Sequence, residues 1–451
     1  MLRETKMEQQ PGKEVEKESP REGQVNTTNT ATTEPDTDTD TAVVEATKGI
    51  DMLGVLGEAG QATGSQGAAA AATTTTTAAE AAEGEGEASS SDAAGAPPCA
   101  QEQSDDRSVL QVLFETCGGS FWRVKIAWGT AAPMMAWFGI GTCSGVGADE
   151  RISKLALPWN KLAGNLPSAL GSLSALEELV LNDNMLTGAI PLEVCKLSGL
   201  QVLLLHNNKL AGGIPSNIGV LSSLRAVHLN NNQLTGPIPA SIGDLPSLVE
   251  LQLHNNKLNG AIPPAISNLS SLRVLSLSNN QLAGDIPKEM GQLSSLIALA
   301  LDGNTLSGRL PAELGRLSCL QDLRLHSNRL TGNLPAELGN LGATRVMMLG
   351  ENKFEGALPL EMGMASSLEI LDLQKNKLSG VIPPEIGNLA ALRVLSLSEN
   401  TISGAIPAEL GNLSALQMLR LTDNKLTGKL PPAVAELASL KVKKLDGNLL
   451  D

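Results

Sequence analysis

The stretch "LLLHNNKLAGGIP" at residues 203–215 decides the fold of this chain, because it returns as "LQLHNNKLNGAIP" at residues 251–263. The interval of 48 residues is two periods of 24. Asn recurs every 24 residues, 13 times from Asn160 to Asn448, and the first twelve are each followed by Gly four residues on and Pro seven residues on. A period of this length predicts a repeat protein whose units stack on their neighbours.

The repeat unit reads L-x-x-L-x-L-x-x-N-x-L-x-G-x-I/L-P-x-x-L/I-G-x-L. Its L-x-L segment predicts a short strand with both leucines in the core, since strand side chains alternate between two faces. Leu203 and Leu205 should therefore be buried and His206 should face outward. The Asn follows the strand, where its amide can satisfy backbone groups that no ladder reaches. Gly permits a bend, and Pro fixes φ where the chain turns back.

The composition agrees with a stack of such units. Only 8 of the 451 residues are aromatic, with no Tyr, and seven of the eight lie between Phe114 and Trp159. The eighth is Phe354, so most of the core must be built from Leu and Ile. Five scattered cysteines show no metal-site spacing such as C-x-x-C.

The first 105 residues differ from the rest. Stretches such as "TTNTATTEPDTDTDT" hold few large apolar side chains, which predicts a disordered tail. Residues 1–106 hold 6 of the 33 basic and 21 of the 48 acidic residues, a net charge of −15, so the remainder is neutral. A neutral body behind an acidic tail argues against nucleic acid as a partner. Order should begin near Asp106, with Ser108 capping a short helix that stops at Gly118 and Gly119.

The repeat unit resembles that of the plant-type leucine-rich-repeat family, over about residues 106–451. The resemblance implies a right-handed α/β solenoid: a horseshoe with a parallel sheet on its concave side and a second, shorter strand in each coil. The N-terminal part also looks like the family's cap, on residues Asp106, Arg107, Leu110, Leu113, Gly118, Gly119, Trp122, Trp128 and "WFGIGTC" at 137–143. The expected domains are a tail at 1–105, a cap at 106–150 and repeats at 151–451, twelve complete and a thirteenth cut short.

The cap departs from the family at its cysteine pair. Met135 stands where the first Cys is expected, and Cys143 falls one residue late. The N-terminus also lacks the apolar run of a signal peptide. Together these features slightly favour the cytoplasm, with the cell surface or extracellular space as the alternative implied by the resemblance. The array ends three residues after Asn448, without a polar capping motif, which suggests a fragment of a longer protein or an exposed edge strand.

Motifs for catalysis and for membrane insertion are weak. The sequence has no G-x-x-x-x-G-K-[ST], H-E-x-x-H, G-x-S-x-G or kinase signature. Residues 126–147 are uncharged over 22 positions, but five Gly and one Pro disfavour a spanning helix there. The sequence therefore predicts neither an enzyme nor a transmembrane segment, and it predicts no cofactor.

The candidate site is the concave face of the sheet, where the strand register directs all four histidines. A metal site between His206 and His254 is conceivable, but no Cys joins them and Glu250 is the nearby carboxylate, so solvated sheet residues are the simpler reading. Trp159, beside Asn160, is an interface anchor or a cap contact. The predicted ligand-binding residues are Trp159, His206, His228, His254, Arg324 and His326. The predicted structural asparagines are Asn184, Asn208, Asn232, Asn256, Asn280, Asn304, Asn328, Asn352, Asn376, Asn400 and Asn424.

These features favour a non-enzymatic protein that binds a protein, peptide or glycan partner on its concave face. The resemblance implies a role in signalling or defence. The alternative is the sensor portion of a larger receptor kinase or GTPase.

Overall fold

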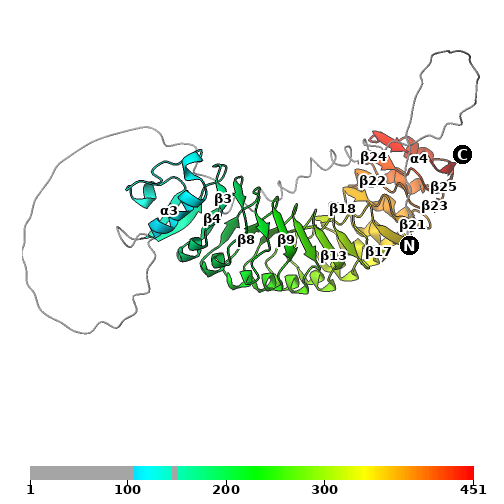
Figure 1. The fold of residues 1–451 in the computed structure, drawn as a ribbon. Helices are drawn as coiled ribbons and strands as arrows, with labels where there is room; N and C mark the ends of the chain where they lie inside the picture. Colours follow the sequence, from blue (N-terminus) through cyan, green and yellow to red (C-terminus); the bar gives the residue numbers. More distant parts are fainter. Residues whose placement is uncertain (1–105, 145–150) are drawn as a thin grey trace, which may run out of the picture. The chain divides into compact units, whose positions relative to one another are not determined.

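A computed structural model describes residues 106–144 and 151–451 of the chain, all of which belong to one compact unit, Ala59–Asp451. The predicted tail at 1–105 and its disorder lie outside the described residues. Within the unit, short strands stack side by side in chain order, and one-turn 3-10 helices line the opposite side of the stack (Figure 1). The predicted leucine-rich-repeat solenoid is confirmed. The division at 150/151 into cap and repeats stays a prediction.

The main sheet of the described residues has 14 strands, of which only the first pair is antiparallel. In order these are β1 (Ile140–Ser144), β2 (Arg151–Ala156), β4 (Glu178–Val180), β6 (Val202–Leu204), β8 (Ala226–His228), β10 (Glu250–Gln252), β12 (Val274–Ser276), β14 (Ala298–Ala300), β16 (Asp322–Arg324), β18 (Val346–Met348), β20 (Ile370–Asp372), β22 (Val394–Ser396), β24 (Met418–Arg420) and β26 (Val442–Lys444). Each residue of a parallel strand pairs with the residue 24 positions further along the chain, as Leu251 pairs with Leu275.

A second, shorter strand follows in each coil, as the family resemblance implies. These strands form smaller parallel sheets and are β3 (Ala163–Asn165), β5 (Met185–Thr187), β7 (Ala211–Gly212), β9 (Gln233–Pro237), β11 (Lys257–Gly260), β13 (Gln281–Asp285), β15 (Thr305–Ser307), β17 (Thr331–Asn333), β19 (Lys353–Ala357), β21 (Lys377–Ser379), β23 (Ser403–Gly404), β25 (Lys425–Gly428) and β27 (Leu449–Leu450).

The helical turns come next in each coil and begin one residue after the repeated Pro, except η6, which begins three residues after it. They are η4 (Ser168–Ser172), η5 (Leu192–Lys196), η6 (Ile218–Val220), η7 (Ala240–Asp244), η8 (Pro264–Asn268), η9 (Lys288–Gln292), η10 (Ala312–Arg316), η11 (Ala336–Asn340), η12 (Leu360–Met364), η13 (Pro384–Asn388), η14 (Ala408–Asn412) and the α-helix α4 (Pro432–Ala435). In nearly every coil a Pro occupies the N-cap of the turn, as Pro335 does in η11, and its ring fixes φ where the turn begins.

The core is a continuous ladder of Leu and Ile. Leu203, Leu205, Leu251 and Leu253 are fully buried, as the strand register predicts. Phe354 occupies a place that Leu fills in most other coils and is also fully buried. Because each coil alone buries little apolar area, the stacking of neighbours supplies the hydrophobic stabilisation.

The N-terminal residues form an aromatic cluster that covers the first coil. The helix α3 (Asp106–Thr116) precedes two short turns, η1 (Gly119–Phe121) and η2 (Met134–Ala136). Phe114, Trp122, Trp128 and Trp137 pack with ring centroids 4.9–6.0 Å apart. Each of these three indoles donates to a backbone carbonyl, so these tryptophans are structural.

The prediction that Ser108 caps the first helix is wrong, because the helix already begins at Asp106. The Asp106 side chain is buried and accepts bonds from the Ile152 amide at 2.9 Å and the Arg151 guanidinium at 3.1 Å. This contact ties the start of the helix to β2 and draws Ser108 into the first turn.

Candidate functional site: the open face of the main sheet

The candidate site lies on the face of the main sheet that points away from the leucine core. Each coil presents three outward positions there, two, four and six residues before its conserved Asn. We call this surface the open face. Among the predicted residues, His206, His254 and His326 occupy the first of these positions, and His228 and Arg324 occupy the second. All five side chains are half-buried.

Three histidines come together on β6, β8 and β10 and the turns after them. The rings of His206 and His228 have centroids 5.8 Å apart. His228 Nε2 lies 2.9 Å from the Glu250 carboxylate, and His206 Nε2 lies 3.9 Å from that of Asp183. His254 Nδ1 shares a 3.0 Å hydrogen bond with the Ser276 hydroxyl. We call these three histidines with Asp183 and Glu250 the histidine cluster.

Two imidazoles of the histidine cluster, those of His206 and His254, have lowered pKa values. Burial is the main cause that lowers the pKa of His206 to about 4, and the neighbouring His228 lowers it further, while Asp183 opposes the shift. Burial also lowers the pKa of His254, again with help from His228 and against Asp302. A ligand therefore does not meet charged imidazoles at His206 and His254 near neutral pH. At pH 7 they offer neutral donors and acceptors.

The same column contains polar atoms whose hydrogen-bonding capacity is unmet. His206 Nδ1, Asn182 Oδ1 and Asn230 Oδ1 are buried and have no partner among the described residues. The three residues occupy one outward position on three successive coils. Buried polar groups are nearly always paired, so this row is an exception that calls for a bonding partner.

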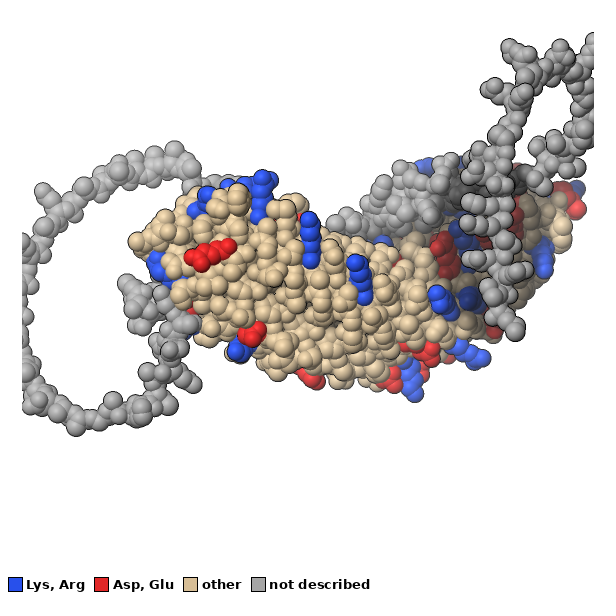
Figure 2. Space-filling model, in the orientation of Figure 1, with Lys and Arg blue, Asp and Glu red and all other residues tan. Residues whose placement is uncertain are grey.

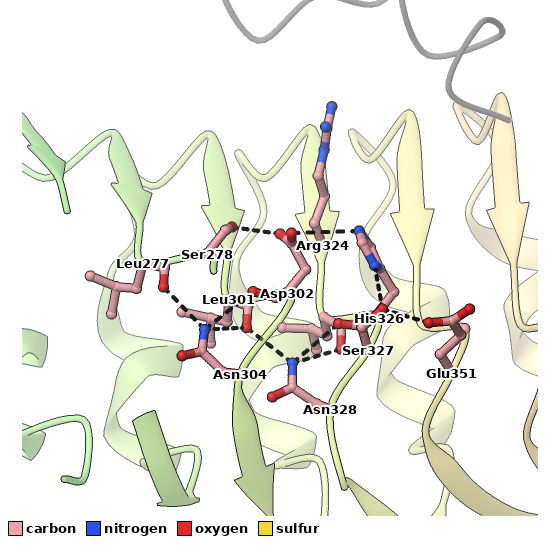
Figure 3. Close-up of polar contacts among 12 residues, drawn as sticks. Leu277, Ser278, Leu301, Asp302, Asn304, Arg324, His326, Ser327, Asn328 and Glu351 are labelled. Atoms are coloured by element: carbon pink, nitrogen blue, oxygen red, sulfur yellow. Dashed lines mark hydrogen bonds and ion pairs between the residues drawn. The ribbon is translucent and has the colours of Figure 1, made fainter. Parts of the chain in front are cut away.

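A second group of charged side chains lies further along the open face. Figure 3 shows Ser278, Asp302, His326, Ser327 and Glu351 in one row of contacts. Ser278 donates to Asp302 at 2.6 Å, His326 Nε2 lies 3.6 Å from Asp302, and Ser327 donates to Glu351 at 2.7 Å. We call this row, with Asp322 and Arg324, the charged cluster. Arg324 forms a bidentate bond with Asp322 at 2.9–3.1 Å.

The carboxylates in and beside the charged cluster have pKa values that are shifted in different directions. Burial raises the pKa of Asp322, although Arg324 partly offsets that effect. Burial likewise raises the pKa of Asp372 on β20. Burial would also raise the pKa of Glu351, but hydrogen bonds from Ser327 and Lys375 outweigh it and hold that pKa below its usual range. The carboxylate with the lowered pKa is thus Glu351, beside Ser327 and Lys375, whereas burial acts against the charged form of Asp322 beside Arg324.

Trp159 does not join either cluster. It precedes Asn160, whose carbonyl accepts from the Arg123 amide at 3.1 Å and whose Oδ1 accepts from Val124, so Trp159 lies beside the cap. Trp159 is 65 % exposed, so most of its surface is open to solvent. Its role as an interface anchor stays a prediction. The predicted site thus consists of two groups on the open face and one tryptophan apart from them.

Sequence reasoning missed most of the carboxylates. Glu250 lies near the histidines, as expected, since it contacts His228 at 2.9 Å. It is not the only carboxylate there, because Asp183 lies beside His206 and the charge of Asp302 acts on His254. Asp302 shares its repeat position with His254 and His326, and Asp322 shares its position with Glu250. Reading the sequence by columns of the repeat, and not by residue type alone, would have found both.

The conserved asparagines form an unbroken row beneath the open face. The amide of Asn256 donates to the carbonyls of Leu253 and Leu229, both at 3.0 Å, and its oxygen accepts from the Leu234 amide at 2.9 Å. Every predicted structural Asn from Asn184 to Asn424 makes the same three contacts. Figure 3 shows the bonds that the amide nitrogens of Asn304 and Asn328 donate. Each Asn therefore connects two coils and fixes the turn that follows the strand.

The described residues contain neither a group of metal-binding side chains nor a membrane-spanning helix. Within residues 106–144 and 151–451, no three His, Cys, Asp or Glu side chains stand close enough to hold a metal ion. In the same residues, no helix has the length and apolar composition needed to cross a bilayer. Cys117, Cys195 and Cys319 are free thiols.

Comparisons with known proteins identify the class. Leucine rich repeat profiles match residues 222–282 and 366–426, and also 199–221 and 319–341. The crystal structure of a TDR receptor is 34% identical, with a TM-score of 0.62, over 64% of this chain and 50% of that chain. The Arabidopsis receptor kinase HAESA in complex with the peptide hormone IDA and the co-receptor SERK1 is 31% identical, with a TM-score of 0.58, over 64% of this chain and 52% of that chain.

A third similar structure is the plant peptide hormone receptor RGFR1 in complex with RGF2, at 30% identity and a TM-score of 0.53, over 65% of this chain and 55% of that chain. The chain therefore spans about half the length of these receptors. A search of curated protein sequences found no match. The repeats and the fold define a solenoid of leucine-rich repeats. The chain is a leucine-rich-repeat protein of the plant type.

The lowered pKa of His206 predicts a loss of stability in acid. Unfolded His titrates near 6.5, so as the pH falls the unfolded chain binds a proton that the native chain refuses until about pH 4. Stability should therefore be complete above about pH 6.5 and fall towards pH 4. We expect His206→Asn, which copies Asn182 and Asn230, to remove about 2 kcal/mol of the loss between pH 7 and 4.5. Urea denaturation at both pH values measures it, and equal losses in wild type and variant would contradict the cause.

Proposed function

We propose that this protein is a non-enzymatic binding protein that holds a peptide or protein partner along its open face. One observation carries the proposal: the row of buried polar atoms on Asn182, His206 and Asn230 that have no partner among the described residues. An extended peptide offers a backbone donor and acceptor at every residue, and it can follow a column of side chains across successive coils. The solved structures with peptide hormones support this choice over a glycan.

The two clusters suit different parts of such a partner. Neutral imidazoles and unmet amide oxygens in the histidine cluster favour polar, uncharged groups. The charged cluster presents Arg324 among carboxylates, which favours a segment with charges of both signs. The charge of Asp302 acts on His254, so the two clusters adjoin and one ligand can span them.

The proposed role is recognition in signalling or defence, as in the receptors that this chain resembles. The alternative, that the chain acts as the sensor portion of a larger receptor kinase or GTPase, is supported by the receptor kinase among the similar structures. Sequencing the transcript beyond both ends of this coding region separates the two.

The proposal predicts that partner retention depends on the histidine cluster. The full chain serves as bait for a random peptide library and for an extract of the source cells. We expect the triple variant His206→Asn, His228→Gln, His254→Asn to lose about tenfold or more in retention, because interface energy concentrates in few residues. The replacements copy residues from equivalent places in neighbouring coils, so the fold should hold.

The matched control changes three exposed serines outside the open face, Ser198→Ala, Ser222→Ala and Ser270→Ala. This control should retain partners like the wild type. If the histidine variant retains the same partners as strongly as the control does, the open face is not the binding site.

A further inference from the structure

The cap carries exposed apolar side chains that its own folding does not use. Phe121 is 81 % exposed, Ile126 is 67 % exposed and Phe138 is 40 % exposed. Trp159 is 65 % exposed, whereas the other three tryptophans are buried in the aromatic cluster. Isolated exposed apolar residues are ordinary on protein surfaces, but a group of large ones on one side of a domain marks an interaction site.

Backbone contacts place Ile126, Phe138 and Trp159 close to one another. The Phe138 amide donates to the Ile126 carbonyl at 3.1 Å, so these residues are neighbours. The segment that contains Ile126 also contains Arg123 and Val124, whose amides both donate to Asn160, the residue after Trp159. Residues 121–126 therefore run between Phe138 on one side and Trp159 on the other. We call Phe121, Ile126, Phe138 and Trp159 the cap strip.

Trp159 is held in a backbone conformation that its side chain disfavours. Its φ is +55°, in the left-handed region. The equivalent places in other coils carry small or polar residues, among them Asn207, Asn231 and Ser327. Asn tolerates this conformation because its short side chain bonds locally, and a bulky aromatic residue gains nothing comparable. A tryptophan that is both disfavoured here and exposed contributes nothing evident to folding, which points to a role in binding.

Three exposed cations lie close in the chain to the residues of the cap strip. Arg123, Lys125 and Lys161 are exposed and make no ion pair among the described residues, while the nearby Lys154 and Arg151 pair with Glu178 and Asp106. Between Cys117 and Leu176 the acidic residues are Asp149 and Glu150, which lie outside the described ranges. Figure 2 shows several Lys and Arg side chains, together with an acidic one, at the end of the molecule that carries the cap.

The carboxylate on the coil next to Trp159 does not cancel this charge at the surface. Asp183 accepts hydrogen bonds from Asn182 at 2.6 Å and Asn207 at 2.7 Å, and its side chain is only 7% exposed. Arg123, Lys125 and Lys161 therefore supply exposed positive charge beside the strip.

We propose that the cap strip docks the protein on an anionic lipid bilayer. Trp and Phe with adjacent Lys and Arg are the side chains that occupy the boundary between headgroups and acyl chains, where indole is favoured and cations meet lipid phosphates. The exposed charges on residues 121–126 and next to Asn160 are Arg123, Lys125 and Lys161, and this run of cations beside apolar side chains favours an anionic bilayer over a protein partner. The site is separate from the open face and does not depend on the function proposed for it.

The test uses the full chain and two kinds of vesicle: phosphatidylcholine alone, and an equimolar mixture of phosphatidylcholine and phosphatidylserine. Because Trp122, Trp128 and Trp137 are buried, a change in tryptophan emission on mixing reports Trp159. The mixed vesicles should shift the emission to shorter wavelength and carry the protein into the pellet. High salt should weaken both effects, and phosphatidylcholine alone should give neither.

Two variants and a matched control make the test specific. Trp159→Asn copies the residue of neighbouring coils, so it should fold, and it should lose most of the sedimentation. Arg123→Gln with Lys125→Gln should weaken partition into mixed vesicles about thirtyfold, at roughly fivefold for each cationic side chain near an anionic surface. The control, Lys209→Gln with Lys257→Gln, removes the same charge from exposed positions equivalent to Lys161 and should sediment like wild type.

Three results would overturn the proposal. Wild type that stays in the supernatant with mixed vesicles would reassign the cap strip to a protein partner. Equal binding to both kinds of vesicle would remove the role of the exposed cations. Equal loss in the control and the Arg123 and Lys125 variant would show attraction by net charge alone.

Discussion

Replacing Asn256 with alanine should lower the free energy of unfolding by about 3 kcal/mol or more. The substitution removes one amide that serves the carbonyls of Leu253 and Leu229 and one oxygen that serves the Leu234 amide. All three backbone groups are buried, and each costs roughly 1–3 kcal/mol when it is left without a partner. Because Leu229 belongs to the preceding coil, the loss should spread to the contact between two coils.

Urea denaturation followed by circular dichroism measures this effect, and hydrogen exchange locates it. The control is Asn259→Ala, three residues away on the outer strand β11, where the side chain is exposed. That control should change stability by no more than about 0.5 kcal/mol. Equal effects of the two substitutions would show that the buried amide is not what joins the coils.

Replacing Gly339 with alanine should cost about 3 kcal/mol for a different reason. Gly339 lies in η11, and a Cβ built there would fall on the backbone carbonyl of Glu361 in the next coil. Backbone cannot move aside as a flexible side chain can, so the coils must separate or the turn must distort, and overpacking of this kind costs roughly 1–3 kcal/mol and occasionally more. The same close approach recurs at Gly291, Gly315 and Gly363.

The chain contains its own control for this substitution. A Cβ on Gly342, three residues further on, meets nothing within 4 Å, and its φ is not in the left-handed region. Gly342→Ala should therefore be neutral or slightly stabilising, since alanine restricts the unfolded chain. If both variants melt alike, the close stacking of the helical turns is not a requirement of the fold.

The architecture was predictable from the sequence because one signal is repeated thirteen times. The interval between successive Asn residues specified the coils, and the alternation around Leu203 and Leu205 specified which side chains enter the core. The contact of Asp106 with Arg151 and Ile152 was not predictable in the same way, because it joins residues 45 and 46 positions apart.

The candidate site was predictable in position but not in chemistry. The register alone directs His206 and His254 out of the sheet. Their lowered pKa values depend on burial beside neighbouring coils, which no single repeat reveals. Likewise, the exposure of Trp159 depends on where the cap places residues 121–126. The cap lies outside the repeat pattern from which the rest of the fold was predicted.

We infer that the partner binds to the open face and not to the surface formed by the helical turns. The most direct measurement places a photoreactive benzoylphenylalanine at Gln252, an outward and half-buried position on β10 beside His228, and separately at the exposed Ser222. Each protein is irradiated with the partner captured by the wild-type chain, and the adducts are identified by mass spectrometry. We expect a covalent adduct from position 252 and none from position 222. An adduct from position 222 with none from position 252 would contradict this inference.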